Sequence, residues 1–326
     1  MLHPGFRLTV ALASVLLPLR LIAAEEGSFE RTLNVNGPVR LEVKTGSGSI
    51  QVVAGASNEV RVRAQIRVRS RMFGSSSAVE KVRFIEENPP IEQQGNVIRV
   101  GTFVYPDEDR AEGVSISYEI VAPAETALVA KSGSGSQTLG DLKGPVEATA
   151  GSGSLVIGAI GGDVRARAGS GSIRLDGVQG NLDVRTGSGS ITARKVQGAI
   201  DASAGSGRIE LEQTGPGNVS IESGSGGVDI RGVRGGLSVA TGSGSIHAQG
   251  QMTSNWTLEA SSGGVTVELP PEARFELDAR SSSGHIDSEH PVAVTGRPSR
   301  KTLQGAVRGG GPRLAIDTSS GSISIR

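Results

Sequence analysis

A tetrapeptide that returns at a nearly constant interval constrains the fold of this chain more than any other feature. Gly-Ser-Gly-Ser or a close variant begins at seven positions, and the steps between them are equal except for one that is longer by a single residue. A fixed period over so much of a chain is typical of a solenoid, in which each repeat is one supersecondary unit stacked on its neighbours. The seven copies begin at Gly133, Gly151, Gly169, Gly187, Gly205, Gly224 and Gly242.

Each repeat predicts two short strands on either side of a glycine corner. In residues 180–197, Leu182 and Val184 alternate with polar residues before the corner, and Ile191 and Ala193 do so after it. Alternation with a period of two is typical of strands with one buried face, whereas helices are disfavoured because glycine interrupts every unit. The sequence therefore predicts an all-β fold, a single-chain parallel β-helix (solenoid) with coils of about 18 residues.

The composition fits a thin interior filled by stacked aliphatic side chains. Aromatic residues make up only 3% of the 326 residues, and 48 residues are glycine. The corner glycines are expected either to adopt a positive φ or to allow a close approach of two backbones, since glycine does both without steric cost.

Two stretches break the period. Within 55–127, an alternating run over 59–71, a capping box at Ser77 that opens a helix to about Glu87, and two further strands predict an insert that caps one end. Residues 288–311 are rich in Pro, Gly and Arg and predict a long loop. The predicted organisation is a signal peptide over 1–24 and one β-solenoid domain over 25–326, with the capping insert over 55–127, regular coils over 128–287, the loop over 288–311 and closing strands over 312–326.

The N-terminal segment, 1–24, predicts a secretory signal peptide. Arg7 precedes an apolar run from Leu8 to Leu19, and small residues before Glu25 predict cleavage after Ala24. A membrane anchor is the less favoured alternative, because the run is short for a bilayer and Arg20 interrupts it. The mature chain is expected to be exported without a membrane span and to be periplasmic, on the cell surface or secreted.

The residue content predicts no catalytic residue, no metal site and no cofactor. The chain has no Cys, and its histidines lack the spacing of a metal site such as H-E-x-x-H. The residue after each corner is Ser, Arg, Gly or His, whereas calcium-binding β-helix repeats place Asp there. A net charge of zero gives no reason to expect nucleic-acid binding. The histidines that follow the signal peptide are His247, His285 and His290.

We therefore expect a protein that is not an enzyme. A polysaccharide-active enzyme is the minor alternative, but its site would need clustered carboxylates and aromatic sugar platforms.

An alternating row of arginines is the strongest local charge feature. It would suit an anion-binding edge for an acidic polysaccharide, a lipid headgroup or a wall polymer. The pattern favours the alternative of a solvated strand face whose charges discourage edge pairing, with Glu42, Glu86, Glu87 and Glu92 as neutralising partners. The row consists of Arg61, Arg63, Arg67, Arg69 and Arg71.

The repeat length also predicts external columns of charge. Residues one repeat apart should stack on parallel strands separated by about 4.8 Å. One predicted column joins Glu147, Arg165 and Asp183, and a second joins Arg194, Glu212 and Arg231.

The repeated V-x-A-x-T/A-G-S-G-S-I units, the early copy at Gly46, the Ala122-Pro123 step and the ending over 314–323 resemble the bacterial putative-adhesin family of β-strand repeats, a domain of unknown function. The likeness covers about residues 30–326. It implies a β-helical fold and an adhesive role, and it supplies no catalytic residues.

Together these features predict an exported, non-enzymatic cell-envelope protein that serves adhesion or binding through its flat faces. Its partner would be an envelope polymer, another protein or a second copy. The main alternative is a structural envelope element whose coils self-assemble end to end.

Overall fold

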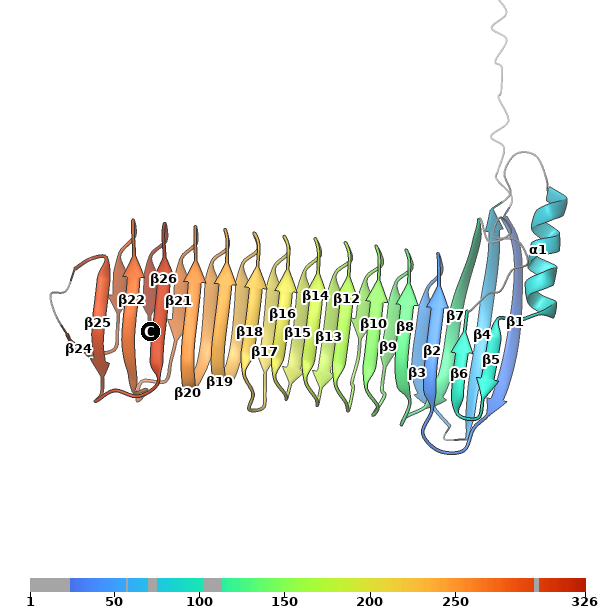
Figure 1. Ribbon diagram of the computed structural model, residues 1–326, viewed down its shortest axis with the longest axis horizontal. Helices are drawn as coiled ribbons and strands as arrows, with labels where there is room; N and C mark the ends of the chain where they lie inside the picture. Colours follow the sequence, from blue (N-terminus) through green and yellow to red (C-terminus); the bar gives the residue numbers. More distant parts are fainter. Residues whose placement is uncertain (1–23, 57, 70–74, 102–112, 296–298) are drawn as a thin grey trace, which may run out of the picture.

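Each coil contributes one strand before the glycine corner and one after it, so two walls of strands run along the molecule. The computed structural model describes residues 24–56, 58–69, 75–101, 113–295 and 299–326. The predicted signal peptide lies outside these residues except for Ala24. The strands stack into a straight, elongated body with one helix at one end (Figure 1).

The wall that precedes the corners is called the front wall here. Its strands are parallel except at the two ends. In stacking order it contains β5 (Ile91–Gln94), β6 (Val97–Val100), β2 (Arg40–Thr45), β8 (Ala127–Ser132), β10 (Val146–Ala150), β12 (Val164–Ala168), β14 (Leu182–Thr186), β16 (Ile200–Ala204), β18 (Val219–Ser223), the later parts of β19 (Val228–Thr241) and β20 (Ile246–Ala260), β26 (Arg313–Thr318), β22 (Phe275–Ser281), β25 (Thr302–Val307) and β24 (Val292–Val294).

The wall that follows the corners is the rear wall. The long strands β19 and β20 begin in it and cross to the front wall, so that the two walls form one mixed sheet. In stacking order it contains β1 (Ala24–Asn34), β4 (Glu59–Arg69), β7 (Val114–Pro123), β3 (Ile50–Gly55), β9 (Gln137–Gly140), β11 (Leu155–Ile157), β13 (Ile173–Val178), β15 (Ile191–Val196), β17 (Ile209–Gln213), the early parts of β19 and β20, β21 (Val265–Glu268), β27 (Ile323–Ile325) and β23 (Ile286–Ser288).

The core is the narrow space between the walls, and the predicted inward residues fill it. Leu182 pairs in register with Val164 on one side and Ile200 on the other, and all three side chains are buried. Ile191 is equally buried on the rear wall, while its neighbour Thr192 is half-buried on the outer surface. The predicted inward and outward assignment of these strands is confirmed.

Close backbone approach explains the corner glycines. None of the glycines that open or close a Gly-Ser-Gly corner has a positive φ. A Cβ added at Gly171 would instead overlap the carbonyl oxygen of Gly153, one coil earlier. A buried hydroxyl joins this corner to the next one, because Thr186 Oγ1 donates to the carbonyl of Gly171 at 3.0 Å and accepts from the amide of Gly189 at 3.2 Å.

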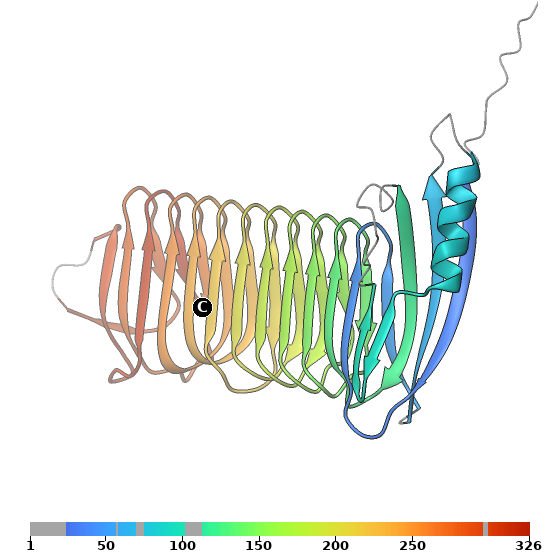
Figure 2. The ribbon, with the colours of Figure 1, turned by 45° about the vertical axis from the view of Figure 1, so that its right-hand side comes forward.

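The predicted insert over 55–127 forms the cap at the N-terminal end. Helix α1 (Ser75–Glu87) buries Val82 and Ile85 and lies against β1 and β4 (Figure 2). The strands predicted by the alternation and the helix predicted by the capping box are confirmed. The purely parallel β-helix is wrong here, because the chain reverses and pairs β4 antiparallel with both β1 and β7.

The insert leaves the stack itself unbroken. Arg40 on β2 pairs directly with Ala127 on β8, although the strands β3 to β7 intervene in the chain. The first coil, formed by β2 and β3, therefore lies between the cap and the regular coils.

The C-terminal end departs from the prediction in two ways. Residues 288–311 are not simply a loop, because they include β24 and β25, and β25 pairs antiparallel with β22. The closing coil formed by β26 and β27 does not end the stack. It lies between the coil of β20 and β21 and the coil of β22 and β23, with Ile316 opposite both Leu258 and Ala279. Both late coils have the same inward alternation, so local pattern alone does not fix their order.

Within the described residues, no helix has the length and apolar character needed to cross a membrane.

Candidate binding surfaces

The predicted arginine row lies on the outer face of the N-terminal cap. On β4, Val62 and Ile66 point inward and are buried, while Arg61, Arg63 and Arg67 lie on the exposed side of the same strand. Arg69 is the last residue of β4, and Arg71 lies outside the described residues.

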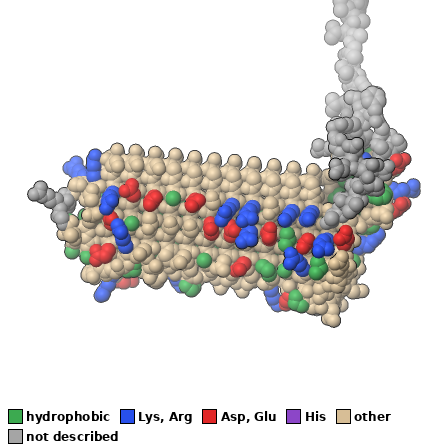
Figure 3. All heavy atoms as spheres, viewed as in Figure 1, with side chains coloured by type: hydrophobic (Ala, Val, Ile, Leu, Met, Phe, Trp, Pro, Cys, Tyr) green, Lys and Arg blue, Asp and Glu red, His purple; other side chains and the backbone are tan. Residues whose placement is uncertain are grey.

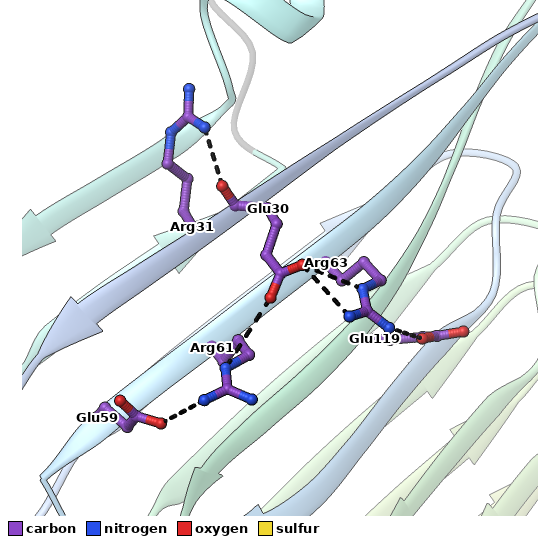
Figure 4. Close-up of polar contacts among 6 residues, drawn as sticks. All are labelled: Glu30, Arg31, Glu59, Arg61, Arg63 and Glu119. Atoms are coloured by element: carbon purple, nitrogen blue, oxygen red, sulfur yellow. Dashed lines mark hydrogen bonds and ion pairs between the residues drawn. The ribbon is translucent and has the colours of Figure 1, made fainter.

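Four carboxylates from three strands surround these arginines, as Figure 4 shows for three of them. Arg61 lies 2.8 Å from Glu59, Arg63 lies 3.3 Å from Glu30 and 4.0 Å from Glu119, and Arg67 lies 3.0 Å from Glu26. The row therefore has little excess positive charge. The geometry is that of a solvated strand face with balanced charge, and the anion-binding edge stays a prediction.

None of the four carboxylates predicted to neutralise this row pairs with Arg61, Arg63 or Arg67 in the described part of the chain. Glu42 lies on the front wall, within 3.2 Å of Arg40 and 3.5 Å of Arg99. Glu86 accepts a hydrogen bond from the amide of Ser28. The antiparallel pairing of β4 with β1 and β7, which the sequence did not reveal, brings other carboxylates to the arginines.

The first predicted column of charge is confirmed in register. Glu147 lies opposite Arg165, and Arg165 lies opposite Asp183 with its Nε 3.0 Å from Oδ2. Asp183 also accepts contacts from Arg167 at 3.5 Å and Arg185 at 3.1 Å. Three guanidinium groups therefore converge on one carboxylate, which is more than the simple alternation predicts.

The second predicted column is broken. Glu212 does lie opposite Arg231, but the register shifts between Ala193 and Val196, and Lys195 there has a φ of 55°. This bulge takes Arg194 out of the column. Arg231 pairs instead with Asp229 on its own strand, at 3.0 Å.

A further row of outward side chains on the front wall was not predicted. Its members lie two residues before each corner, and neighbouring members are opposite each other in register. We call it the charge row. From β2 to β26 it consists of Lys44, Lys131, Thr149, Arg167, Arg185, Ser203, Glu222, Ala240, Glu259 and Asp317.

The charge row is basic in its N-terminal half and acidic in its C-terminal half. Figure 3 shows blue side chains over the half of the front wall near the cap and red side chains over the half beyond it, with further blue side chains at the end far from the cap. Beside the acidic half lies an open groove of about 850 Å³, lined by Glu222, Glu259, Asp317 and residues of the glycine corners.

The three histidines are separated from one another in their contacts. His247 lies 3.8 Å from Glu268, His285 contacts Ser322 at 3.0 Å, and the buried His290 packs edge-on against Phe275. In the part of the chain that the structure describes, no three His, Cys, Asp or Glu side chains form a group suited to a metal ion.

Comparison with known protein families finds one family whose model matches most of this chain. The model of the Toastrack DUF4097 family matches residues 115–326, about two thirds of the chain. The chain belongs to the Toastrack DUF4097 family. The Toastrack match contains the regular coils and the strands β22, β23, β24 and β25 at the other end of the stack, which we call the C-terminal cap. It also contains the charge row from Lys131 to Asp317. The arginine row on β4 precedes the matched residues.

One solved structure similar to this Toastrack chain is described as a putative cell adhesion protein from Clostridium sporogenes ATCC 15579. It has 12% sequence identity and a TM-score of 0.22, over 92% of this chain and 99% of that chain. A likeness at this TM-score carries no argument about function. No curated protein matches the chain.

Proposed function

We propose that this Toastrack protein is an exported, non-enzymatic protein of the cell envelope that serves adhesion or binding through the faces of its solenoid. The observation that carries the proposal is that antiparallel strands cover both ends of the stack, while both walls stay open along its length.

The covered ends favour binding through the walls over end-to-end assembly. At the C-terminal end the outermost strands, β23 and β24, are short, Ile286–Ser288 and Val292–Val294. At the N-terminal end the edge strand β1 carries Glu26 and Glu30, and α1 packs against it. Short or charged edge strands oppose pairing with another sheet.

The open walls suit a partner with a repeating structure. Side chains on neighbouring strands recur about every 4.8 Å, so an extended polymer would meet many similar contacts at once. A groove of about 530 Å³ on the front wall, lined in part by Asp163, Arg165 and Asp201, offers such a track.

The arrangement of the acids supports a non-enzymatic role. A general acid or base must be free to exchange a proton with its substrate. Asp183, one of the acids that line the front groove, is held by Arg165, Arg167 and Arg185. We infer that it positions arginines and does not transfer protons.

The test uses the protein recovered after export and immobilised acidic polysaccharide or peptidoglycan. We expect saturable binding that weakens with salt, and polymer chains of unchanged length after long incubation. Shortened chains would contradict the non-enzymatic role, and the absence of binding to every envelope polymer and envelope protein tested would contradict the proposal.

A matched variant locates the binding surface. Replacing Arg61, Arg63 and Arg67 by Ser removes three of the five arginines of the row without touching the walls of the regular coils. Binding that survives this change assigns the interaction to the walls. Binding that is lost assigns it to the predicted anion-binding edge.

A further inference from the structure

Five charged members of the charge row have no ion-pair partner among the described residues. Lys44, Lys131, Glu222, Glu259 and Asp317 are exposed, and within the described residues none of them forms an ion pair. Arg167 and Arg185, near the middle, contact Asp183 and are 46% and 50% exposed. The front wall therefore presents unpaired cations at one end and unpaired anions at the other.

A row with cations in one half and anions in the other is complementary in charge to the row of a second copy that runs in the opposite direction. A two-fold axis parallel to the strands, passing between β14 and β16, turns the stack end for end. It places Lys44 opposite Asp317 of a second copy and Lys131 opposite Glu259, since each residue lies the same number of strands from the axis. Arg167 then meets Glu222 in the same way. Because a two-fold interface is isologous, each of these pairs occurs twice.

The charges also favour an axis between β14 and β16 over an axis that lies on either of these strands. Moving the axis onto β14 brings Arg185 against Arg185 of the second copy. Moving it onto β16 brings Lys44 against Arg280, which follows Asp317 in the stack. In the favoured register Arg280 faces Gly101, and no like charges of the charge row meet. Like-charge contacts across an interface oppose association, so these mismatches set the register.

The neighbouring column places like charges opposite each other near the axis in this arrangement, and arginines of the same chain offset them. Asp183 would approach Asp201 of the second copy. Both carboxylates already have arginine partners in their own chain, because Arg185 contacts Asp183 at 3.1 Å and Asp201 at 3.5 Å.

We propose that the front wall is the interface of an antiparallel dimer, in which the basic half of the charge row of one copy faces the acidic half of the other. The dimer would cover the front-wall groove described above, so in the dimer an envelope partner would bind the rear wall. The dimer itself does not rest on the proposed envelope-binding function.

Charge exchange between two variants tests the dimer. The exported protein, purified from cells that express the full chain, should sediment as a dimer at low salt and dissociate as salt rises. The variant Lys44→Glu with Lys131→Glu, and separately the variant Glu259→Lys with Asp317→Lys, should each weaken the dimer at least about tenfold. A mixture of the two variants should form a heterodimer again. Within the described residues these side chains form no ion pair, so folding should be unaffected, and restored association would confirm it.

A rear-wall variant is the matched control. Arg174→Glu reverses an exposed charge on β13 and should leave the dimer intact. Wild-type protein that sediments as a monomer at low salt, or charge-reversed variants that dimerise as well as wild type, would overturn the proposal.

Cross-linking tests the register. The chain contains no Cys, so Lys131→Cys combined with Glu259→Cys introduces the only thiols. Oxidation should give a covalent dimer, whereas Lys131→Cys combined with Thr138→Cys, which places the second thiol on the rear wall, should not.

Discussion

Arg165 and Asp183 lie directly opposite each other on β12 and β14, and the Nε of the arginine is 3.0 Å from Oδ2 of the aspartate. The arginine is 54% exposed and the aspartate 24%. Solvent screening at this exposure keeps the energy of the pair small.

A double-mutant cycle on this pair should therefore give a coupling free energy of about 1 kcal/mol or less, which decreases as salt is added. Asp183→Ala should destabilise more than Arg165→Ala, because the aspartate also pairs with Arg167 and Arg185, which lie opposite each other. Urea denaturation of the four proteins at two salt concentrations measures both effects. A larger cost for Arg165→Ala would contradict the central role of Asp183.

The inward register makes a second prediction. Ile191 is fully buried, so Ile191→Ala should lower the free energy of unfolding by about 2–5 kcal/mol. Thr192→Ala, one residue later on the outer surface, should cost about 0.5 kcal/mol or less. Chemical denaturation of both variants checks the assignment, which would be shifted by one residue if Thr192 were the more sensitive site.

The corners offer a sharper comparison between two glycines. Gly171→Ala places a Cβ against the carbonyl oxygen of Gly153, and we expect a loss of about 1–3 kcal/mol or a failure to fold. Gly46→Ala is the control, because a Cβ there meets nothing within 4 Å. Thermal melts should separate the two variants. Equal melting temperatures would show that the coils separate easily at the corner.

Asp278 at the C-terminal cap should make stability depend on pH. Burial raises the pKa of this carboxyl, but hydrogen bonds from Gln304 and Arg313 and the positive charges of Arg280 and Arg313 together outweigh it, and the pKa is lowered from its usual value. A carboxyl with a lowered pKa in the folded state stabilises the protein above its unfolded pKa of about 3.9 and loses that contribution as pH falls through the lower folded value. Asp278→Asn should therefore destabilise the protein at pH 7 and progressively less below about pH 4. Denaturation curves across this range measure the change, and a constant difference would contradict the assignment.

Removal of metal ions should leave the fold unchanged. The described residues hold their shape through aliphatic columns and backbone ladders, and they contain no group of acidic or histidine side chains suited to a metal. Melting curves with and without excess chelator should overlap. A fall of many degrees in the chelated sample would contradict the prediction and restore the calcium alternative.

The regular coils could be predicted because each residue there interacts with a neighbour at a fixed spacing. Leu182 contacts its column partners one coil away on both sides, so period and alternation are enough to place it. The same reasoning places Arg165 beside Asp183. This reasoning fails at Lys195, where one residue with a positive φ shifts the register. The sequence has no glycine at this position that would indicate the shift.

Elsewhere the prediction was limited because the sequence does not show which strands far apart in the chain pair with each other. The charge row becomes continuous only when the insert is removed, so that Lys44 meets Lys131. Val292 and Val294 form β24 with exposed or half-buried side chains, and an edge strand of this kind lacks the burial alternation by which strands are recognised. The arginine row was visible in the sequence, but its carboxylate partners arrive from β1 and β7 through the reversal of the chain.

The position of the closing coil has a consequence for how the chain acquires its structure. The coil of β22 and β23 precedes Arg313 in synthesis, yet its neighbour in the stack is made from residues 313–326. Coils made one after another can stack as they emerge only as far as β21. Everything beyond that point must wait, with one strand edge open, until residues 313–326 have left the ribosome and, for an exported chain, the translocation channel. The segment 313–326 therefore joins the C-terminal cap to the rest of the stack. A chain that lacks this segment would leave the cap detached from an otherwise ordered stack.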